Sequence, residues 1–148
     1  YCIGVNLEDI ILKRVTKSDI EFLYELLKQR NISHNISHVK TPSLKQHIKF
    51  IDSKPYKRWY IIINNKQKIG TIYISKNSEV GIHFKSNQEK NKLLILVLKQ
   101  FVKFHNEEFF YFNVSTNNKN LNNFFKENSF SLLQLTYKIS KKELEGKW

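Results

Sequence analysis

The sequence predicts an α+β fold, a mixed and mostly antiparallel sheet flanked by helices, in the order β-α-α-β-β-β-α-β-α-β. Three short runs rich in isoleucine and aromatic residues lie between residues 59 and 84, separated only by polar turns. Such spacing is typical of strands joined by hairpins. On both sides of this stretch, apolar residues recur at helical spacing next to further strand-like runs. Hairpins in the centre and strand-helix-strand connections near the end therefore indicate a mixed sheet.

The first third of the chain contains one strand and two helices. Residues 8–15 predict the strand, and Thr16 to Asp19 resemble a capping box at the start of a helix. Apolar residues at helical spacing carry this helix to about Arg30. Residues 31–38 indicate a loop or a short helical turn. Ser43 is expected to cap a second helix, which has Ile48 and Ile51 on one face.

The rest of the chain alternates strands and helices. A long apolar helix starts at Leu93 after the polar loop 85–92, and a short helix covers residues 118–128. Residues 141–148 are expected to form a frayed polar tail. The expected strands are 59–63, 69–74, 79–84, 109–114 and 130–139, the last of which alternates Leu133, Leu135 and Tyr137.

Length and composition indicate one domain over residues 1–148 with a substantial core. The chain has a mass of 17.7 kDa, and 41% of its residues are apolar. No apolar run approaches the roughly 20 residues that cross a bilayer, so no membrane association is expected. The only cysteine is Cys2, which excludes an intramolecular disulfide framework and a cysteine-rich zinc site. These features favour a cytoplasmic protein, and they leave a homodimer open.

The formal net charge of +12 raises the question of nucleic-acid binding. The basic residues are almost all lysines scattered along the chain, with arginine only at positions 14, 30 and 58. No basic arm or arginine-rich stripe forms, so nucleic acid is not an expected partner of this basic protein. The charge can still help to steer an anionic cofactor.

Three local patterns, in this order, resemble the GNAT superfamily of acyl-CoA-dependent N-acetyltransferases. Residues 68–75 (KIGTIYIS) look like the central hairpin strand of that family, and residues 79–84 (EVGIHF) look like the strand before its cofactor loop. Residues 113–118 and 124–130 resemble the family's C-terminal motif. The resemblance covers about residues 9–140 and implies a GNAT fold with acetyl-CoA as acyl donor.

The resemblance also implies where the cofactor binds. Its pantetheine arm would pair with the strand at Ile82, His83 and Phe84, as an added strand would. The family's phosphate loop has the pattern (Q/R)-x-x-G-x-(G/A), which falls on residues 88–93. Gln88 matches, Lys90 and Lys92 add positive charge, and Asn91 and Leu93 stand where small residues are usual. The Leu93 side chain is expected to narrow the approach of the phosphates.

Two further positions match cofactor contacts of the family. Asn118 falls on the asparagine that touches the cofactor, although an N-cap of the following helix explains it equally well. Phe125 falls where many members carry the tyrosine that protonates the leaving thiolate. Phenylalanine cannot donate a proton, so Phe125 is expected to pack on the pantetheine arm or in the core.

Glu79 is the candidate general base, directly or through water, and the alternative is a carboxylate that closes the turn before it. With phenylalanine at position 125, the leaving thiolate would take its proton from water or from another group such as Tyr111. The remaining alternative is that no group protonates it. The proposed acceptor is a primary amine of a small molecule or of a protein N-terminus. A non-catalytic binding protein with the same fold is the alternative function.

The segment between the first two helices usually lines the acceptor pocket of the family. Arg30, His34 and His38 are therefore the candidate substrate-binding residues, with a solvated loop as the alternative. His34 and His38 also have the four-residue spacing of two metal ligands on a helix. No third ligand follows at a suitable distance in the sequence, so no metal site is expected.

Overall fold

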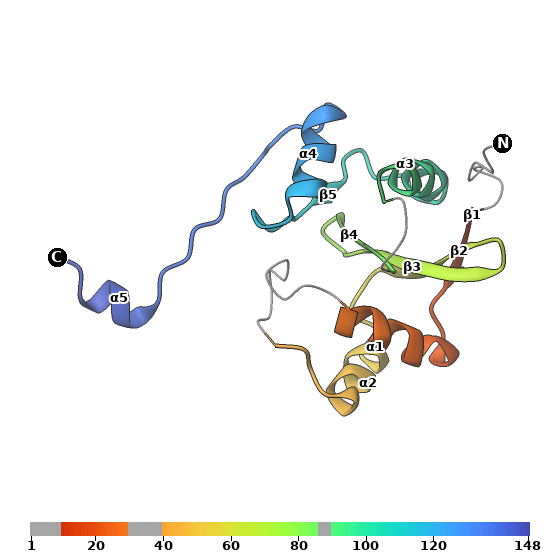
Figure 1. Cartoon of the computed structure of the whole chain (residues 1–148), viewed down its shortest axis with the longest axis horizontal. Coiled ribbons are helices and arrows are strands. Elements are labelled where there is room, and N and C mark those ends of the chain that lie inside the picture. The colour runs from red at the N-terminus through yellow and green to blue at the C-terminus, as the bar shows by residue number, and fades with distance from the viewer. Residues whose placement is uncertain (1–9, 30–39, 86–89) are drawn as a thin grey trace.

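The computed structural model describes residues 10–29, 40–85 and 90–148, with only the backbone of Lys90 (Figure 1). Within these ranges one sheet forms, and helices pack on both of its faces, which confirms the predicted α+β class. Its strands are β1 (Ile10–Arg14), β2 (Arg58–Asn64), β3 (Gln67–Ile74), β4 (Glu79–Phe84) and β5 (Tyr111–Phe112). The helices are α1 (Ile20–Gln29), α2 (Leu44–Asp52), α3 (Lys90–Phe101), α4 (Lys119–Glu127) and α5 (Lys141–Glu145).

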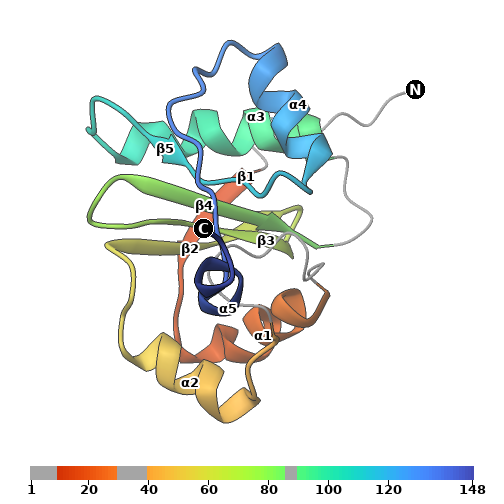
Figure 2. The ribbon, with the colours of Figure 1, turned by 90° about the vertical axis from the view of Figure 1, so that its left-hand side faces the viewer.

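The strands lie in sequence order, β1-β2-β3-β4-β5. Neighbours are antiparallel from β1 to β4, and β5 runs parallel to β4. Helices α1 and α2 cover one face of the sheet, and α3 and α4 lie over the other (Figures 1 and 2). None of the helices in the described ranges is long and apolar enough to cross a membrane.

The helix starts follow the signals in the sequence. The Ser43 Oγ accepts a hydrogen bond from the Gln46 N–H at 3.2 Å, and the Gln46 Oε1 accepts one from the Ser43 N–H at 2.8 Å. This reciprocal pair is a capping box and fixes the start of α2. Before α1, the Asp19 carboxylate accepts a hydrogen bond from the Thr16 N–H at 2.8 Å.

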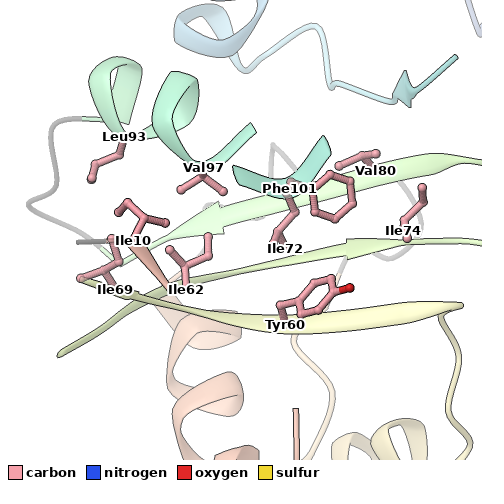
Figure 3. Close-up of a cluster of buried hydrophobic side chains, with 10 residues drawn as sticks. All are labelled: Ile10, Tyr60, Ile62, Ile69, Ile72, Ile74, Val80, Leu93, Val97 and Phe101. Atoms are coloured by element: carbon pink, nitrogen blue, oxygen red, sulfur yellow. The ribbon is translucent and has the colours of Figure 1, made fainter. Parts of the chain in front are cut away.

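Each face of the sheet has its own apolar cluster, because successive side chains of a strand point to opposite faces. The smaller cluster joins Leu23 of α1 and Ile51 of α2 to Ile61 of β2. The larger cluster lies between the sheet and α3 (Figure 3). Its buried members are Ile10, Tyr60, Ile62, Ile69, Ile72, Ile74, Val80, Leu93, Val97 and Phe101.

The C-terminal part differs from the sequence-based expectation. The predicted strand 109–114 is reduced to Tyr111–Phe112. The predicted strand 130–139 is absent, and this segment is extended without a partner strand in the described residues. Alternating apolar residues are not sufficient for a strand, because a strand also needs a neighbour to bond its backbone. Residues 141–145 of the predicted frayed tail form α5, which Ser140 caps through the Glu143 N–H.

Candidate functional site

The sheet opens between β4 and β5. The two strands pair in parallel only at Glu79 with Tyr111 and at Val80 with Phe112. The Tyr111 N–H also donates to the Ser78 carbonyl oxygen at 2.9 Å. Beyond Val80, β4 continues for four residues to Phe84 with no further pairing to β5. The strands therefore part beside residues 82–84, where the resemblance places the pantetheine arm.

The open edge of β4 can be assigned from the hydrogen bonds that flank it. The Ser75 N–H donates to the Glu79 oxygen, and the Lys85 N–H donates to the Ile69 oxygen. Bonded residues alternate along an antiparallel ladder, so Gly81 and His83 bond to β3. The backbone N–H and C=O of Ile82 and Phe84 consequently face the opening. Ile82, His83 and Phe84 were predicted to bond the pantetheine arm through their backbones. The backbone groups of Ile82 and Phe84 do face the opening, whereas those of His83 face β3.

Glu79 and Tyr111 lie side by side where the strands part, because they are paired residues. The Glu79 Oε2 accepts a hydrogen bond from the Asn113 Nδ2 at 2.7 Å. Asn113 was not a sequence-based candidate, although it lies two residues after Tyr111 and so on the same face. The Glu79 N–H donates to the Ser75 Oγ at 3.2 Å, so its backbone also closes the preceding turn. The turn is therefore closed by the Glu79 backbone, whereas the Glu79 carboxylate contacts Asn113.

A set of aromatic side chains lies on the same face of the sheet as Glu79. Tyr73 pairs with Gly81 across β3 and β4, and a Cβ at Gly81 would lie only 2.1 Å from the Tyr73 Cζ. The Tyr73 ring stacks on Tyr56 at a centroid distance of 3.7 Å, and Tyr56 meets Trp59 edge-on. These rings form an aromatic wall (Tyr56, Trp59 and Tyr73), and none of the three was a sequence-based candidate. The alternation of β2 and β3 was the signal that could have found it.

Helix α3 begins soon after β4, and its first turn contains no acidic residue. Asn91 and Lys92 are exposed in this turn, so both side chains are available to an anion. Leu93 is instead 2% exposed and packs in the larger apolar cluster (Figure 3). The expectation that its side chain narrows the phosphate path is therefore wrong, because the helical turn directs this side chain to the sheet.

Asn118 and Phe125 both have structural roles. The Asn118 Oδ1 accepts from the Leu121 N–H at 3.3 Å and caps α4, as one of its two interpretations predicted. Phe125 is partly buried and lies 5.0 Å from Phe112 and 4.6 Å from Phe130 between ring centroids. It belongs to an aromatic cluster between α4 and β5.

Several candidates lie outside the described residues. These are Arg30, His34, His38 and Gln88, together with the side chain of Lys90. The structure therefore does not describe the positions of the predicted substrate-binding residues. Among the residues that are described, no group of three potential metal ligands comes together.

Comparisons of sequence find no matching family model and no matching curated protein. Comparison with solved structures does find similar chains. One is a spermidine N-acetyltransferase from Vibrio cholerae in complex with CoA and spermine, 18% identical over 81% of this chain and 79% of that one, with a TM-score of 0.66. Another is a ribosomal L7/L12 alpha-N-protein acetyltransferase in complex with coenzyme A, 15% identical over 85% and 81%, with a TM-score of 0.62.

A third similar structure is an aminoglycoside N-acetyltransferase in complex with CoA. It is 14% identical over 90% of this chain and 95% of that one, with a TM-score of 0.62. At such low identity the likeness concerns the fold. The chain has the fold of the GNAT N-acetyltransferases, as the motifs in its sequence indicated.

Proposed function

We propose that this protein is an N-acetyltransferase that moves an acetyl group from acetyl-CoA to a primary amine of a small molecule or of a protein N-terminus. The observation that carries the proposal is the opening between β4 and β5, which leaves one edge of β4 unpaired from Gly81 to Phe84 in the described residues. It occurs in a fold shared with three structures named as N-acetyltransferases, each in complex with CoA.

The described residues fit an elongated, anionic cofactor. The backbone groups of Ile82 and Phe84 offer a donor and an acceptor to the amides of a pantetheine arm. The exposed first turn of α3, with Asn91 and Lys92, offers backbone N–H groups and positive charge to a pyrophosphate. Lys90 and Gln88 belong to the same stretch of sequence. Acetyl-CoA would supply the acyl group as an activated thioester.

The residues where the strands part provide the acid-base chemistry of the proposal. An ammonium group must lose a proton before its nitrogen can attack, and Glu79 accepts that proton directly or through water. The hydrogen bond from Asn113 holds the Glu79 carboxylate in place. Tyr111, beside Glu79, is the phenol that can return a proton to the leaving sulfur. The aromatic wall borders this position and suits the carbon skeleton of an amine acceptor.

The Glu79→Gln variant tests this assignment. Removing the base is expected to lower kcat by about 10²-fold, while the affinity for CoA changes little because the carboxylate is not part of the proposed cofactor contacts. Acetylation can be followed by mass spectrometry, with spermidine, an aminoglycoside and an N-terminal peptide as acceptors, and CoA binding by calorimetry. Glu127→Gln, an exposed glutamate at the end of α4, is the matched control. Unchanged turnover in Glu79→Gln would assign Glu79 to the turn alone.

The second candidate function is a non-catalytic binding protein. Phe125 favours it, because a phenylalanine packed among Phe112 and Phe130 supplies no proton at that position. A thermal-shift measurement with CoA, acetyl-CoA and a short oligonucleotide separates the alternatives, since a ligand raises the melting temperature only if it binds the folded state. Stabilisation by acetyl-CoA without acetylation of any acceptor would favour the binding protein.

A further inference from the structure

Residues of β2, β3 and β4 lie side by side on the face of the sheet that α1 and α2 cover (Figures 1 and 2). Trp59 of β2 packs against the apolar cluster of this face. Trp59 pairs with Tyr73 of β3, and Tyr73 pairs with Gly81 of β4. Paired residues present their side chains to the same face, and Glu79 shares it because it lies two residues before Gly81. The aromatic wall and the candidate base therefore lie on one side of the opening.

The Tyr73 side chain is held in place by its neighbours on this face. The Trp59 Nε1 donates to the Thr71 Oγ1 at 2.8 Å, and this hydroxyl donates to the Tyr60 carbonyl oxygen at 2.7 Å, which fixes the indole. The Tyr56 ring meets the indole edge-on at a centroid distance of 4.9 Å. Tyr56 then stacks on the Tyr73 ring at 3.7 Å, with an interplanar angle of 13°. These contacts orient the Tyr73 ring without using its hydroxyl group.

Gly81 lets the Tyr73 hydroxyl reach over β4. A Cβ at position 81 would lie 2.3 Å from the Tyr73 hydroxyl oxygen and 2.1 Å from its Cζ, so the end of the Tyr73 side chain occupies the space above the Gly81 backbone. Gly81 is also the first residue of β4 after the last pair with β5, that of Val80 with Phe112. The hydroxyl therefore lies where the strands begin to part. Because Tyr56 covers one face of the ring, the hydroxyl end is the part of Tyr73 that a ligand at this position meets.

The spacing between the Tyr73 hydroxyl and Glu79 suits one amine nitrogen. Glu79 and Gly81, over which the hydroxyl lies, are two residues apart on a strand, a rise of roughly 7 Å. A nitrogen that forms a hydrogen bond of about 2.9 Å on each side separates its two partners by up to about 6 Å. The hydrogen bond from Asn113 holds the Glu79 carboxylate beside the opening. Because the two lengths are similar, one amine can contact the carboxylate and the Tyr73 hydroxyl at the same time.

We infer that the Tyr73 hydroxyl oxygen binds the acceptor amine by accepting a hydrogen bond from its nitrogen. The inference rests on the proposed function, because it assigns one further contact in the same site. The ammonium group of a primary amine has three N–H bonds. When Glu79 takes one proton, one of the two remaining N–H groups bonds to Tyr73, and the lone pair is left to attack the thioester carbon. Tyr73 therefore determines how tightly and in which direction the amine is held, while Glu79 deprotonates it.

The Tyr73→Phe variant removes the hydroxyl and keeps the ring, so the melting temperature is expected to remain unchanged. A hydrogen bond made equally in the ground state and the transition state affects binding alone. The KM for the amine is therefore expected to rise about 10-fold, with kcat changed less than about 2-fold. Calorimetry with CoA-saturated protein is expected to show the same loss of affinity for spermidine, an aminoglycoside or an N-terminal peptide, and CoA itself is expected to bind as before. Tyr137→Phe, at a tyrosine that is 88% exposed and outside both apolar clusters, is the matched control.

The possible results separate this inference from the proposed function. If the parent acetylates an amine and Tyr73→Phe has the same KM, the inference is wrong and the acetyltransferase assignment stands. If no amine is acetylated but one binds the parent about 10-fold more tightly than Tyr73→Phe, the contact is right and the protein is the non-catalytic binding protein. If no amine is acetylated and none binds, both are wrong. A lower kcat with an unchanged KM, or a lower melting temperature, in Tyr73→Phe would mean that the hydroxyl serves the chemistry or the packing instead.

Discussion

At the scale of single residues, Asp19 is a charged group enclosed at the junction of the sheet and α1. Its side chain is 0% exposed, and its two oxygens lie 2.7 Å from the Lys13 Nζ and 2.8 Å from the Lys68 Nζ. Burial by itself raises the pKa of this carboxyl. The hydrogen bonds from the two lysines and from the Thr16 backbone outweigh burial and lower the pKa to about 2. The carboxylate thus joins β1, β3 and the start of α1.

The Asp19→Asn variant is expected to lower the free energy of unfolding by about 2 kcal/mol near neutral pH, the usual size for charge-assisted hydrogen bonds. Because the folded pKa lies below the unfolded one, this stabilisation is complete above pH 3.8 and is lost as the pH falls toward about 2. Urea unfolding across this range measures it. Asp52→Asn, at the exposed end of α2, is the control and is expected to change stability little. If stability depends on pH in the same way in the parent and in Asp19→Asn, the ion pairs of Asp19 contribute nothing to the free energy of unfolding.

At the scale of elements, β4 forms the wall of the opening, and Gly81 decides how closely Tyr73 can pack on it. A Cβ at Gly81 would lie 2.1 to 2.3 Å from three atoms of the Tyr73 side chain. Because Tyr73 is stacked on Tyr56, its ring cannot move without breaking up the aromatic wall. Position 81 therefore has room for glycine but not for a residue with a Cβ.

Gly81→Ala is expected to destabilise the fold by about 1–3 kcal/mol, the range for overpacking, and to weaken binding of the amine acceptor. In a Tyr73→Ala background the same substitution is expected to cost much less, since the clashing ring is gone. Gly146→Ala is the control, because its Cβ would find only ordinary contacts at 3.6 and 3.7 Å. Thermal unfolding of the four variants measures these differences. A Gly81→Ala cost that is equal in both backgrounds would exclude the clash as its cause.

At the scale of the whole molecule, two buried histidines on opposite sides of the sheet are expected to make the stability of the fold depend on pH. His47 of α2 is buried beside the Tyr24 ring of α1, and burial lowers its pKa. His105 is buried under the end of α3 and shares a hydrogen bond of 3.1 Å between its Nε2 and the Tyr60 hydroxyl. Burial also lowers the His105 pKa, and this outweighs the opposing effect of the Glu107 carboxylate. Both rings are therefore neutral in the folded protein at pH 7.

Because these histidine pKa values lie below the unfolded value of 6.5, their stabilisation is present above pH 6.5 and declines as the pH falls below it. The melting temperature of the parent is expected to fall between about pH 6.5 and 5. A His47→Gln and His105→Gln double variant is expected to show a clearly smaller fall, although it starts from a lower melting temperature. If the melting temperature falls equally with pH in both proteins, groups other than these two histidines cause the pH dependence.

Local signals in the sequence determined most of the elements of this protein. The cap at Ser43, the alternation through 59–84 and the apolar spacing from Leu93 each depend on residues close in sequence. For the same reason, the motifs indicated the GNAT fold and placed the pantetheine arm along residues 82–84.

Only the tertiary structure decided the features that depend on contacts between distant segments. Leu93 belongs to one buried cluster with Ile10 and Ile62, which are far from it in sequence, and this burial of its side chain could not be read from residues 88–93 alone. The hydrogen bond from Asn113 to Glu79 and the stacking of Tyr56 on Tyr73 likewise join different elements. The segment 130–139 has the pattern of a strand, but a strand forms only where a free edge is within reach. The sequence by itself therefore determined the pattern of this segment, and only the tertiary structure showed that no strand of the described residues pairs with it.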